Sequence, residues 1–138
     1  MEKSAKELKN EYQYFLNNIS KNLDQMENLL SVEKLTFSPN EIEKSYRLYF
    51  ENYKNPEKIG LSYHELEELI YTYWGEAFMH HKGGEWALNL SKTDKAYGTP
   101  TIEKWGGKDY PWSRISPKVW KIRLENGILG KPEKIFGK

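Results

Sequence analysis

Apolar side chains recur every three or four residues along the first 31 positions of the chain. This spacing predicts one long amphipathic helix over residues 3–31. Its apolar stripe consists of Leu8, Tyr12, Phe15, Ile19, Leu23, Met26 and Leu30. Asparagine and lysine side chains fall off this stripe, so we expect them to face water.

A second helix is predicted to begin at Ser38. The Ser38 side chain can accept the backbone N–H of Glu41, and Pro39 loses no hydrogen bond at the first helical position. Aromatic and aliphatic side chains then recur with helical spacing as far as Tyr53. Asn55-Pro56 is expected to end this helix.

The third predicted helix is the most hydrophobic, and we place it at the centre of the fold. Ser62 and Glu65 form a capping box at its start, and a wide apolar face follows from Leu66 to Phe78. Gly75 lies inside this helix and costs about 1 kcal/mol relative to alanine. We interpret it as a point where another stretch of backbone comes close.

The hydrophobic period changes after Gly83-Gly84. Trp86, Leu88 and Leu90 alternate with more polar residues, which predicts a strand with one buried face. A partner strand is predicted over residues 99–105, where Pro100 favours a position near an edge. Residues 110–115 are expected to be extended.

A short helix is expected to begin at Ser116-Pro117 and to stop at Asn126-Gly127. The sequence thus predicts a single α+β domain over residues 1–138. A three-helix layer (1–82) is followed by a small antiparallel sheet and a short closing helix (83–138).

Composition excludes several classes of protein. With 21 Lys and Arg against 20 Asp and Glu, the net charge is +1, which does not favour a nucleic-acid partner held by gross charge. The absence of cysteine excludes disulfides and thiolate metal sites. The sequence contains no apolar stretch typical of a secretory signal or a membrane span, so we expect a cytoplasmic protein without a membrane partner.

The near-neutral total combines two opposed halves. Residues 1–70 carry 13 acids and 9 bases, a net charge of −4, whereas residues 71–138 carry 7 acids and 12 bases, a net charge of +5. Two interpretations follow. The halves form solvated faces that attract each other, or the acidic helices meet a basic partner.

Glu76, His80 and His81 are the strongest candidates for a polar site. Glu76 and His80 lie four residues apart and therefore share a helix face. A zinc site needs more ligands than this pattern supplies, so we expect neither a metal nor a catalytic residue here. The chain also has no GxSxG, GxGxxG or phosphate-loop motif, and we expect no cofactor. The alternative is a small metal-dependent hydrolase that uses Glu76, His80 and His81.

Aromatic and cationic residues alternate between Trp105 and Arg114. Proteins that bind single-stranded nucleic acid use this combination, so a nucleic-acid-binding regulatory domain is a further alternative.

Two glycine- and aromatic-rich segments, 73–76 and 83–86, carry a resemblance to other proteins. Their order is Tyr-x-Gly-Glu and then Gly-Gly-x-Trp, and they contain Tyr73, Trp74, Gly75, Glu76, Gly83, Gly84 and Trp86. A Pro-containing strand (99–102) and a Pro-started helix (117–127) follow. This order resembles small bacterial proteins, some of which look like immunity proteins encoded beside toxins. We interpret the motif as structural, with Trp86 folding back onto Tyr73 and Trp74, and Glu76 pairing with backbone amides at the turn.

The leading hypothesis is a non-enzymatic binding protein, a bacterial immunity protein that neutralises a cognate, basic toxin by direct contact. Its contact residues would be exposed acids and tyrosines of the second and third predicted helices. These residues are Glu41, Glu43, Glu51, Glu57, Glu65, Glu67, Glu68, Tyr49, Tyr53 and Tyr63.

Overall fold

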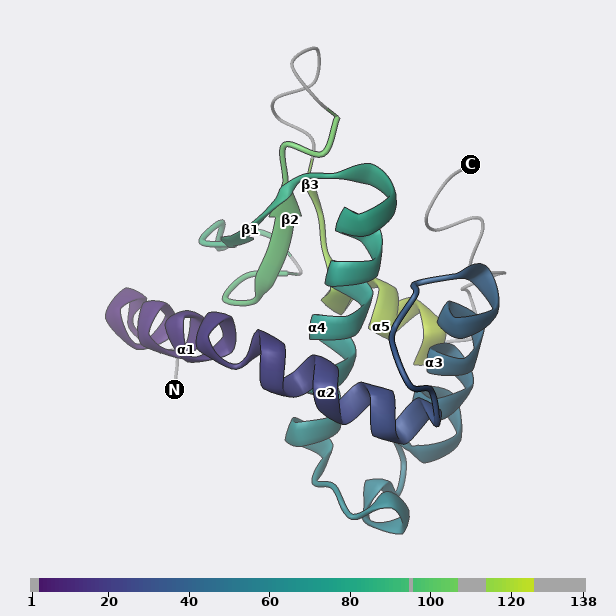
Figure 1. The fold of residues 1–138 in the computed structure, drawn as a ribbon. Coiled ribbons are helices and arrows are strands. Elements are labelled where there is room, and N and C mark those ends of the chain that lie inside the picture. Colours follow the sequence, from purple (N-terminus) through teal and green to yellow (C-terminus); the bar gives the residue numbers. More distant parts are fainter. Residues whose placement is uncertain (1–2, 95, 107–113, 126–138) are drawn as a thin grey trace.

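The computed structural model of the chain describes residues 3–94, 96–106 and 114–125 and has an α+β fold (Figure 1). The elements, in order, are α1 (Ala5–Asn17), α2 (Ile19–Leu30), α3 (Pro39–Asn52), the 3-10 helix η1 (Pro56–Ile59), α4 (Tyr63–Lys82), β1 (Glu85–Leu88), β2 (Pro100–Glu103), β3 (Arg114–Ile115) and α5 (Pro117–Glu125). The predicted fold class and the order of helices, sheet and closing helix are confirmed. The predicted three-helix layer is wrong, because four α-helices precede the sheet.

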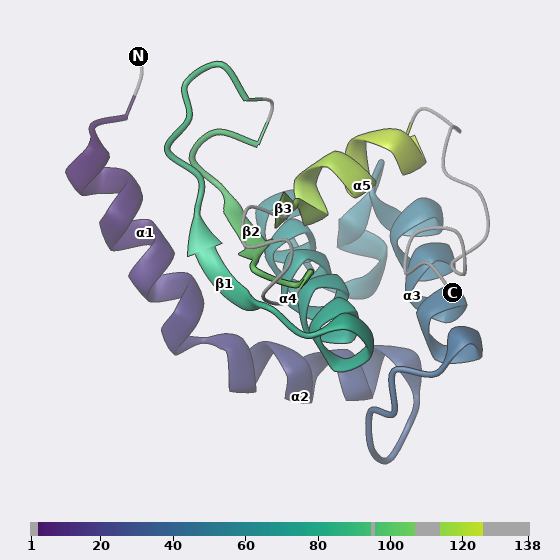
Figure 2. The same cartoon turned by 90° about the horizontal axis from the view of Figure 1, so that it is seen from above.

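The additional helix arises because the predicted long helix is divided at Asn18. Asn18 leaves the helical region (φ −106°, ψ 6°), and its side-chain amide donates to the carbonyl of Tyr14 at 2.7 Å. Asparagine competes for backbone partners in this way and therefore weakens a helix interior. Figure 2 shows that α1 and α2 meet at an angle. The apolar stripe is divided accordingly, because Phe15 of α1 packs against Trp86 of β1, whereas Met26 of α2 belongs to the core around α4.

The predicted helix starts are confirmed. Ser38 Oγ accepts from the backbone N–H of Glu41 at 3.2 Å, and Ser62 and Glu65 form a reciprocal capping box. A third serine, Ser4, caps α1 in the same way with Glu7. Side-chain acceptors at these positions satisfy N–H groups that have no partner inside the helix.

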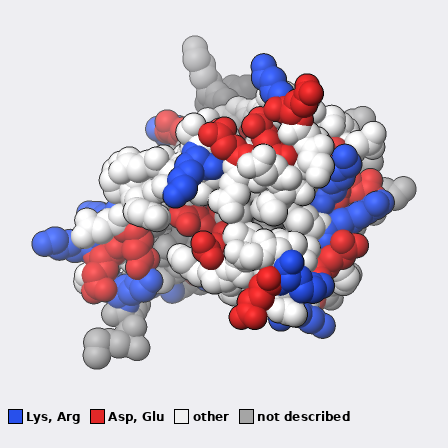
Figure 3. Space-filling model, turned by 60° about the horizontal axis from the view of Figure 1, so that its bottom comes forward, with Lys and Arg blue, Asp and Glu red and all other residues white. Residues whose placement is uncertain are grey.

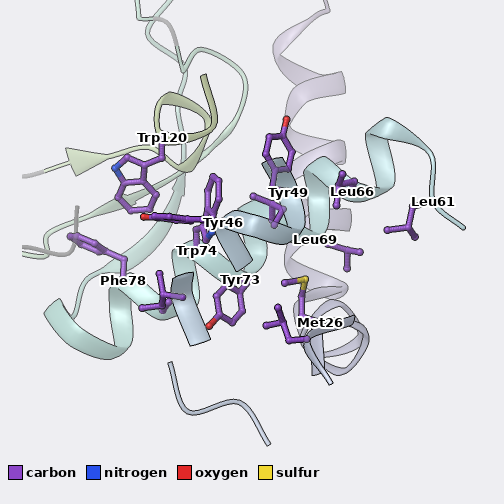
Figure 4. Close-up of a cluster of buried hydrophobic side chains, with 14 of the residues drawn as sticks. Met26, Tyr46, Tyr49, Leu61, Leu66, Leu69, Tyr73, Trp74, Phe78 and Trp120 are labelled. Atoms are coloured by element: carbon purple, nitrogen blue, oxygen red, sulfur yellow. The ribbon is translucent and has the colours of Figure 1, made fainter. Parts of the chain in front are cut away.

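α4 lies at the centre of the fold, as predicted. It contacts α2, α3, α5 and β2, and Figure 2, which looks roughly along α4, places the strands on one side and α3 and α5 on the other. The core around it contains Met26 from α2, Tyr46 and Tyr49 from α3, and Trp120 from α5 (Figure 4). Burial of these large apolar groups is the main stabilising contribution to such a fold.

The sheet is antiparallel, in the order β1-β2-β3. β1 pairs with all of β2, from Glu85 opposite Glu103 to Leu88 opposite Pro100. Within the described residues, β3 pairs with Ile102 and Glu103 of β2. Pro100 belongs to the middle strand, β2, and pairs with Leu88 of β1. On the side of β3, no described residue pairs with Pro100. An unpaired side suits proline, because it has no backbone N–H to donate to a neighbouring strand.

Gly83 and Gly84 form the connection between α4 and β1, as predicted. Both have positive φ angles, 79° and 103°, which glycine adopts at little cost. A side chain at Gly84 would also meet the backbone of Glu103 at 2.9 Å.

Within the part of the chain that the structure describes, no helix is long and apolar enough to span a bilayer.

Candidate functional site

A groove lies between α1, the first turns of α4 and the loop that leads into β2. Its volume is about 600 Å³, and we call it the α1–α4 groove. Its lining is acidic and aromatic, with Lys3, Leu8, Glu11, Tyr12, Tyr14 and Phe15 on the α1 side, His64, Glu67, Glu68 and Tyr71 on α4, and Tyr97, Gly98, Thr99 and Pro100 on the loop. With His64 neutral, three carboxylates and one lysine give this lining a formal charge of −2.

Two contacts hold α1 in place as one wall of the groove. Phe15 packs edge-on against the Trp86 ring of β1, with 5.0 Å between the ring centroids. Near the other end of α1, Leu8 is buried over Gly98, where an added Cβ would lie 3.0 Å from the leucine side chain. Gly98 has a φ of 79°, so both its conformation and its small size suit this position.

The loop wall is held by its own hydrogen bonds. Buried Asn89 donates from its side chain to Asp94 at 3.0 Å and accepts the backbone N–H of Ser91 at 2.9 Å. Asp94 also accepts the backbone N–H of Ala96 at 2.8 Å, and these bonds hold the pKa of Asp94 below its usual value. Tyr97 and Gly98 are therefore presented to the groove by an ordered turn.

Glu68 is the carboxylate in the groove that is not neutralised. It is partly buried, and among the described residues its carboxylate makes no hydrogen bond or ion pair. Burial raises the pKa of Glu68, and the nearby His64 and Lys21 offset this only in part. A desolvated carboxylate without a partner is a favourable position for an incoming cation.

The other two carboxylates of the groove already have partners. Glu11 pairs with Lys3 at 2.6 Å on the exposed rim. Glu67 pairs at 2.5 Å with Lys121 of α5, whose side chain is only 6% exposed. Lys3 and Lys121 therefore neutralise these two acids and leave Glu68 to determine the local charge.

A polar cluster behind the groove joins α3, α4 and α5; we call it the Lys121 cluster. Lys121 donates to Glu67 and, at 2.8 Å, to the hydroxyl of Tyr63, while the hydroxyls of Tyr49 and Tyr63 both donate to Glu125. Burial alone would lower the pKa of Lys121, but these partners outweigh it and raise the pKa. The cluster anchors α5 on the core and keeps Lys121 charged.

The predicted contact residues occupy several different environments. Glu67 and Glu68 lie in the groove. Glu65 is exposed and serves as a helix cap, Tyr53 is half-buried, and Tyr63 belongs to the Lys121 cluster. The remaining exposed acids lie away from the groove, Glu43 and Glu51 on α3 and Glu57 on η1.

The prediction that Glu41 and Tyr49 are exposed is wrong. Glu41 is 5% exposed and accepts hydrogen bonds from the backbone N–H groups of Thr36 and Phe37, both at 2.9 Å, and from the hydroxyl of Tyr73 at 2.7 Å. Burial by itself would raise the pKa of Glu41, but these bonds outweigh it and lower the pKa. Tyr49 is fully buried. Neither side chain can form part of a contact surface in this structure.

The glycine and tryptophan motif has a structural role here, although the contacts differ from those predicted. The Trp86 ring lies on Gly75, where an added Cβ would be 1.9 Å from the ring, so a side chain and not a backbone approaches this glycine. The indole N–H of Trp86 donates to Glu76 at 2.7 Å. Tyr73 and Trp74 point towards α3 instead, and the Trp74 indole donates to Ser45 at 2.9 Å.

Glu76, His80 and His81 do not form a metal centre in this structure. Glu76 is engaged by Trp86, the His80 ring packs on Phe37 at 5.3 Å, and His81 Nε2 lies 2.6 Å from the carbonyl oxygen of Phe37. The described residues contain no group of three or more His, Asp or Glu side chains that could hold a metal ion. Most of the aromatic and cationic segment 105–114, on which the nucleic-acid alternative rests, lies outside the described residues.

Charges of both signs are interspersed on the face that Figure 3 shows, with uncharged surface between them. Among the described ion pairs, only Lys121–Glu67 joins the acidic half of the chain to the basic half. The charge asymmetry along the sequence is therefore not concentrated into one large acidic area on this face.

Sequence reasoning missed further groove residues, namely Glu11 and Tyr14 of α1, Tyr71 of α4 and Tyr97 of the loop. Tyr14 carried a usable signal, because it is an aromatic residue off the apolar stripe, and it is 61% exposed. Tyr71 and Tyr97 carried no such signal, since nothing in their spacing indicates that they face α1.

Comparison of the chain with protein-family models, curated proteins and solved structures finds no match.

Proposed function

We propose that this protein is a non-enzymatic binding protein that holds a basic protein partner at the α1–α4 groove. Neutralisation of a toxin, as by an immunity protein, is the biological role that the sequence resemblance implies. The groove contains two of the residues that the hypothesis named, Glu67 and Glu68. It adds tyrosines from α1 and the loop, a residue type that is common among the energetically dominant positions of protein interfaces.

The observation that carries the proposal is the unpartnered, partly buried carboxylate of Glu68. Its desolvation is unfavourable in the free protein, and a cationic group of a partner would offset that cost with a charge-assisted hydrogen bond. A groove of about 600 Å³ falls in the size range of specific binding sites and has room for several side chains.

The test is binding of the protein that the adjoining gene encodes, the arrangement in which immunity proteins occur. We expect that protein to co-purify with this chain and this chain to protect cells from it. Glu68→Lys should weaken the complex at least about 30-fold, because it places a like charge against the partner's cation.

Glu51→Lys is the matched control. It makes the same change of charge at an exposed position of α3 away from the groove, so its affinity should stay within about threefold of the parent. Equal binding by Glu68→Lys and the parent protein would remove the groove as the contact surface.

A further inference from the structure

We infer that the α1–α4 groove recognises an arginine side chain of the partner, with the guanidinium on Glu68. This inference rests on the proposed function and specifies which group the groove takes. It starts from the distribution of charge among the three carboxylates that line the groove.

Only one carboxylate in the groove is available for an incoming cation. Lys3 Nζ forms an ion pair with Glu11 Oε2 at 2.6 Å, and Lys121 Nζ forms one with Glu67 Oε2 at 2.5 Å. Both oxygens of Glu68 lack hydrogen-bond and ion-pair partners among the described residues, although His64 and Lys21 lie close enough to act on its charge. One free carboxylate matches one monovalent cation, whereas a divalent metal would require further ligands, and no such group lies in the described part of the chain.

Three features of the groove favour guanidinium over ammonium. A free carboxylate with two open oxygens can accept a bidentate pair, which only the flat fork of arginine donates. The site is partly desolvated, and guanidinium is the more weakly hydrated cation. Tyr12 and Tyr97, both half-buried, line the same groove and provide aromatic rings on which a flat cation can stack.

Lys121 decides which groups of the groove stay available to a partner. Its ammonium lies 5.7 Å from the centre of the buried Tyr71 ring, so the cation contact of that ring is already made within the protein. Lys121 also keeps Glu67 neutralised, so Glu68 is the carboxylate lining the groove that has no ion-pair partner among the described residues.

The experiment titrates the peptide acetyl-Gly-Arg-Gly-amide into the isotopically labelled full chain and follows amide chemical shifts by NMR. We expect saturable shifts at the groove positions of α1, α4 and the loop, weakened by salt. The same peptide with citrulline, which has the shape of arginine without its charge, should bind at least tenfold more weakly. Glu68→Gln should cause a similar loss, and Glu51→Gln should cause none.

Equal binding of the arginine and citrulline peptides would overturn the inference, and so would an unchanged affinity of Glu68→Gln. A lysine peptide that binds as tightly as the arginine peptide would overturn the assignment to guanidinium. The citrulline comparison needs no variant, so it does not depend on the folding of one.

The two proposals fail separately. If the arginine peptide binds at Glu68 but the product of the adjoining gene does not bind, only the proposed function falls. If that protein binds in a Glu68-dependent manner while the peptide leaves the groove unchanged, only the arginine inference falls.

Discussion

The carboxylates in the two halves of α4 have different surroundings. At the C-terminal end Glu76 accepts the indole N–H of Trp86, and nearby Tyr73 donates to Glu41 of α3. In the N-terminal half Glu65 caps the helix and Glu67 pairs with Lys121, but Glu68 has no hydrogen-bond or ion-pair partner among the described residues. The first arrangement is closed and satisfied, whereas the second is open to a groove.

The comparison between Glu41 and Glu68 separates a structural acid from a candidate binding acid. Both carry the same carboxylate and both lose water on folding, but only Glu41 regains hydrogen bonds. The pKa of Glu41 is lowered and that of Glu68 is raised. A carboxylate that gains bonds on folding stabilises the fold, and one that gains none costs stability that a ligand can return.

The largest effect is expected at the closed end, from Glu41→Ala. This substitution leaves the N–H groups of Thr36 and Phe37 and the hydroxyl of Tyr73 without their acceptor, and Phe37 has a positive φ of 56° that these bonds help to hold. We expect a loss of about 3 kcal/mol in the free energy of unfolding, measured by urea denaturation.

Glu43→Ala is the control for that substitution, since Glu43 lies on the same helix but its side chain is 49% exposed. It should change stability by less than about 0.5 kcal/mol. Equal effects of the two substitutions would show that the bonds to Glu41 contribute little to stability.

A second effect at the closed end is expected from Gly75→Ala. The new Cβ would lie 1.9 Å from the Trp86 ring, which must shift, so overpacking outweighs the gain in helix propensity. We expect a net loss of about 1–2 kcal/mol by thermal or urea unfolding. The same change in a Trp86→Leu background should cost at least about 1 kcal/mol less, and additive effects would contradict the direct contact.

The smallest effect is expected at the open end, from Glu68→Gln. Because Glu68 has no described partner to lose, stability at neutral pH should stay within about 0.5 kcal/mol of the parent, on the stabilising side. Urea midpoints measure this difference. A loss of more than about 1 kcal/mol would mean that Glu68 holds the fold together.

The pH dependence should separate the same two acids with opposite signs. The lowered pKa of Glu41 means that its stabilisation is present above the unfolded pKa and is lost as pH falls through the folded value. The raised pKa of Glu68 means that its contribution falls as pH rises from the unfolded value to the folded value. Urea unfolding of the parent, Glu41→Gln and Glu68→Gln between about pH 3 and 7, the range in which carboxylates titrate, should therefore show difference curves that slope in opposite directions.

Local signals in the sequence determined much of the secondary structure. The serine caps at Ser38 and Ser62 and the turn at Gly83-Gly84 were predicted because the interactions that decide them lie within a few residues along the chain. The central position of α4 was predicted from its wide apolar face, which must be buried against other elements. The break at Asn18 was not predicted, because apolar spacing continues across it while α1 and α2 pack against different neighbours.

The candidate site was predicted only in part. Glu67 and Glu68 were named from their charge and their position on a helix, together with Glu41, which the structure buries. Helical spacing indicates which face of a helix is apolar, but it does not say which residues from other elements will cover a given acid.

The sequence by itself determined which segments become helices and strands and which side chains are available to them. Only the tertiary structure decided which acids are satisfied. The donors to Glu41 include Tyr73, 32 residues away, the lysine that neutralises Glu67 lies 54 residues away, and the groove around Glu68 needs α1 and the loop before β2 to lie beside α4. The physical reason is that the charge state and availability of a carboxylate depend on its neighbours in space, and the packing of distant segments sets those neighbours.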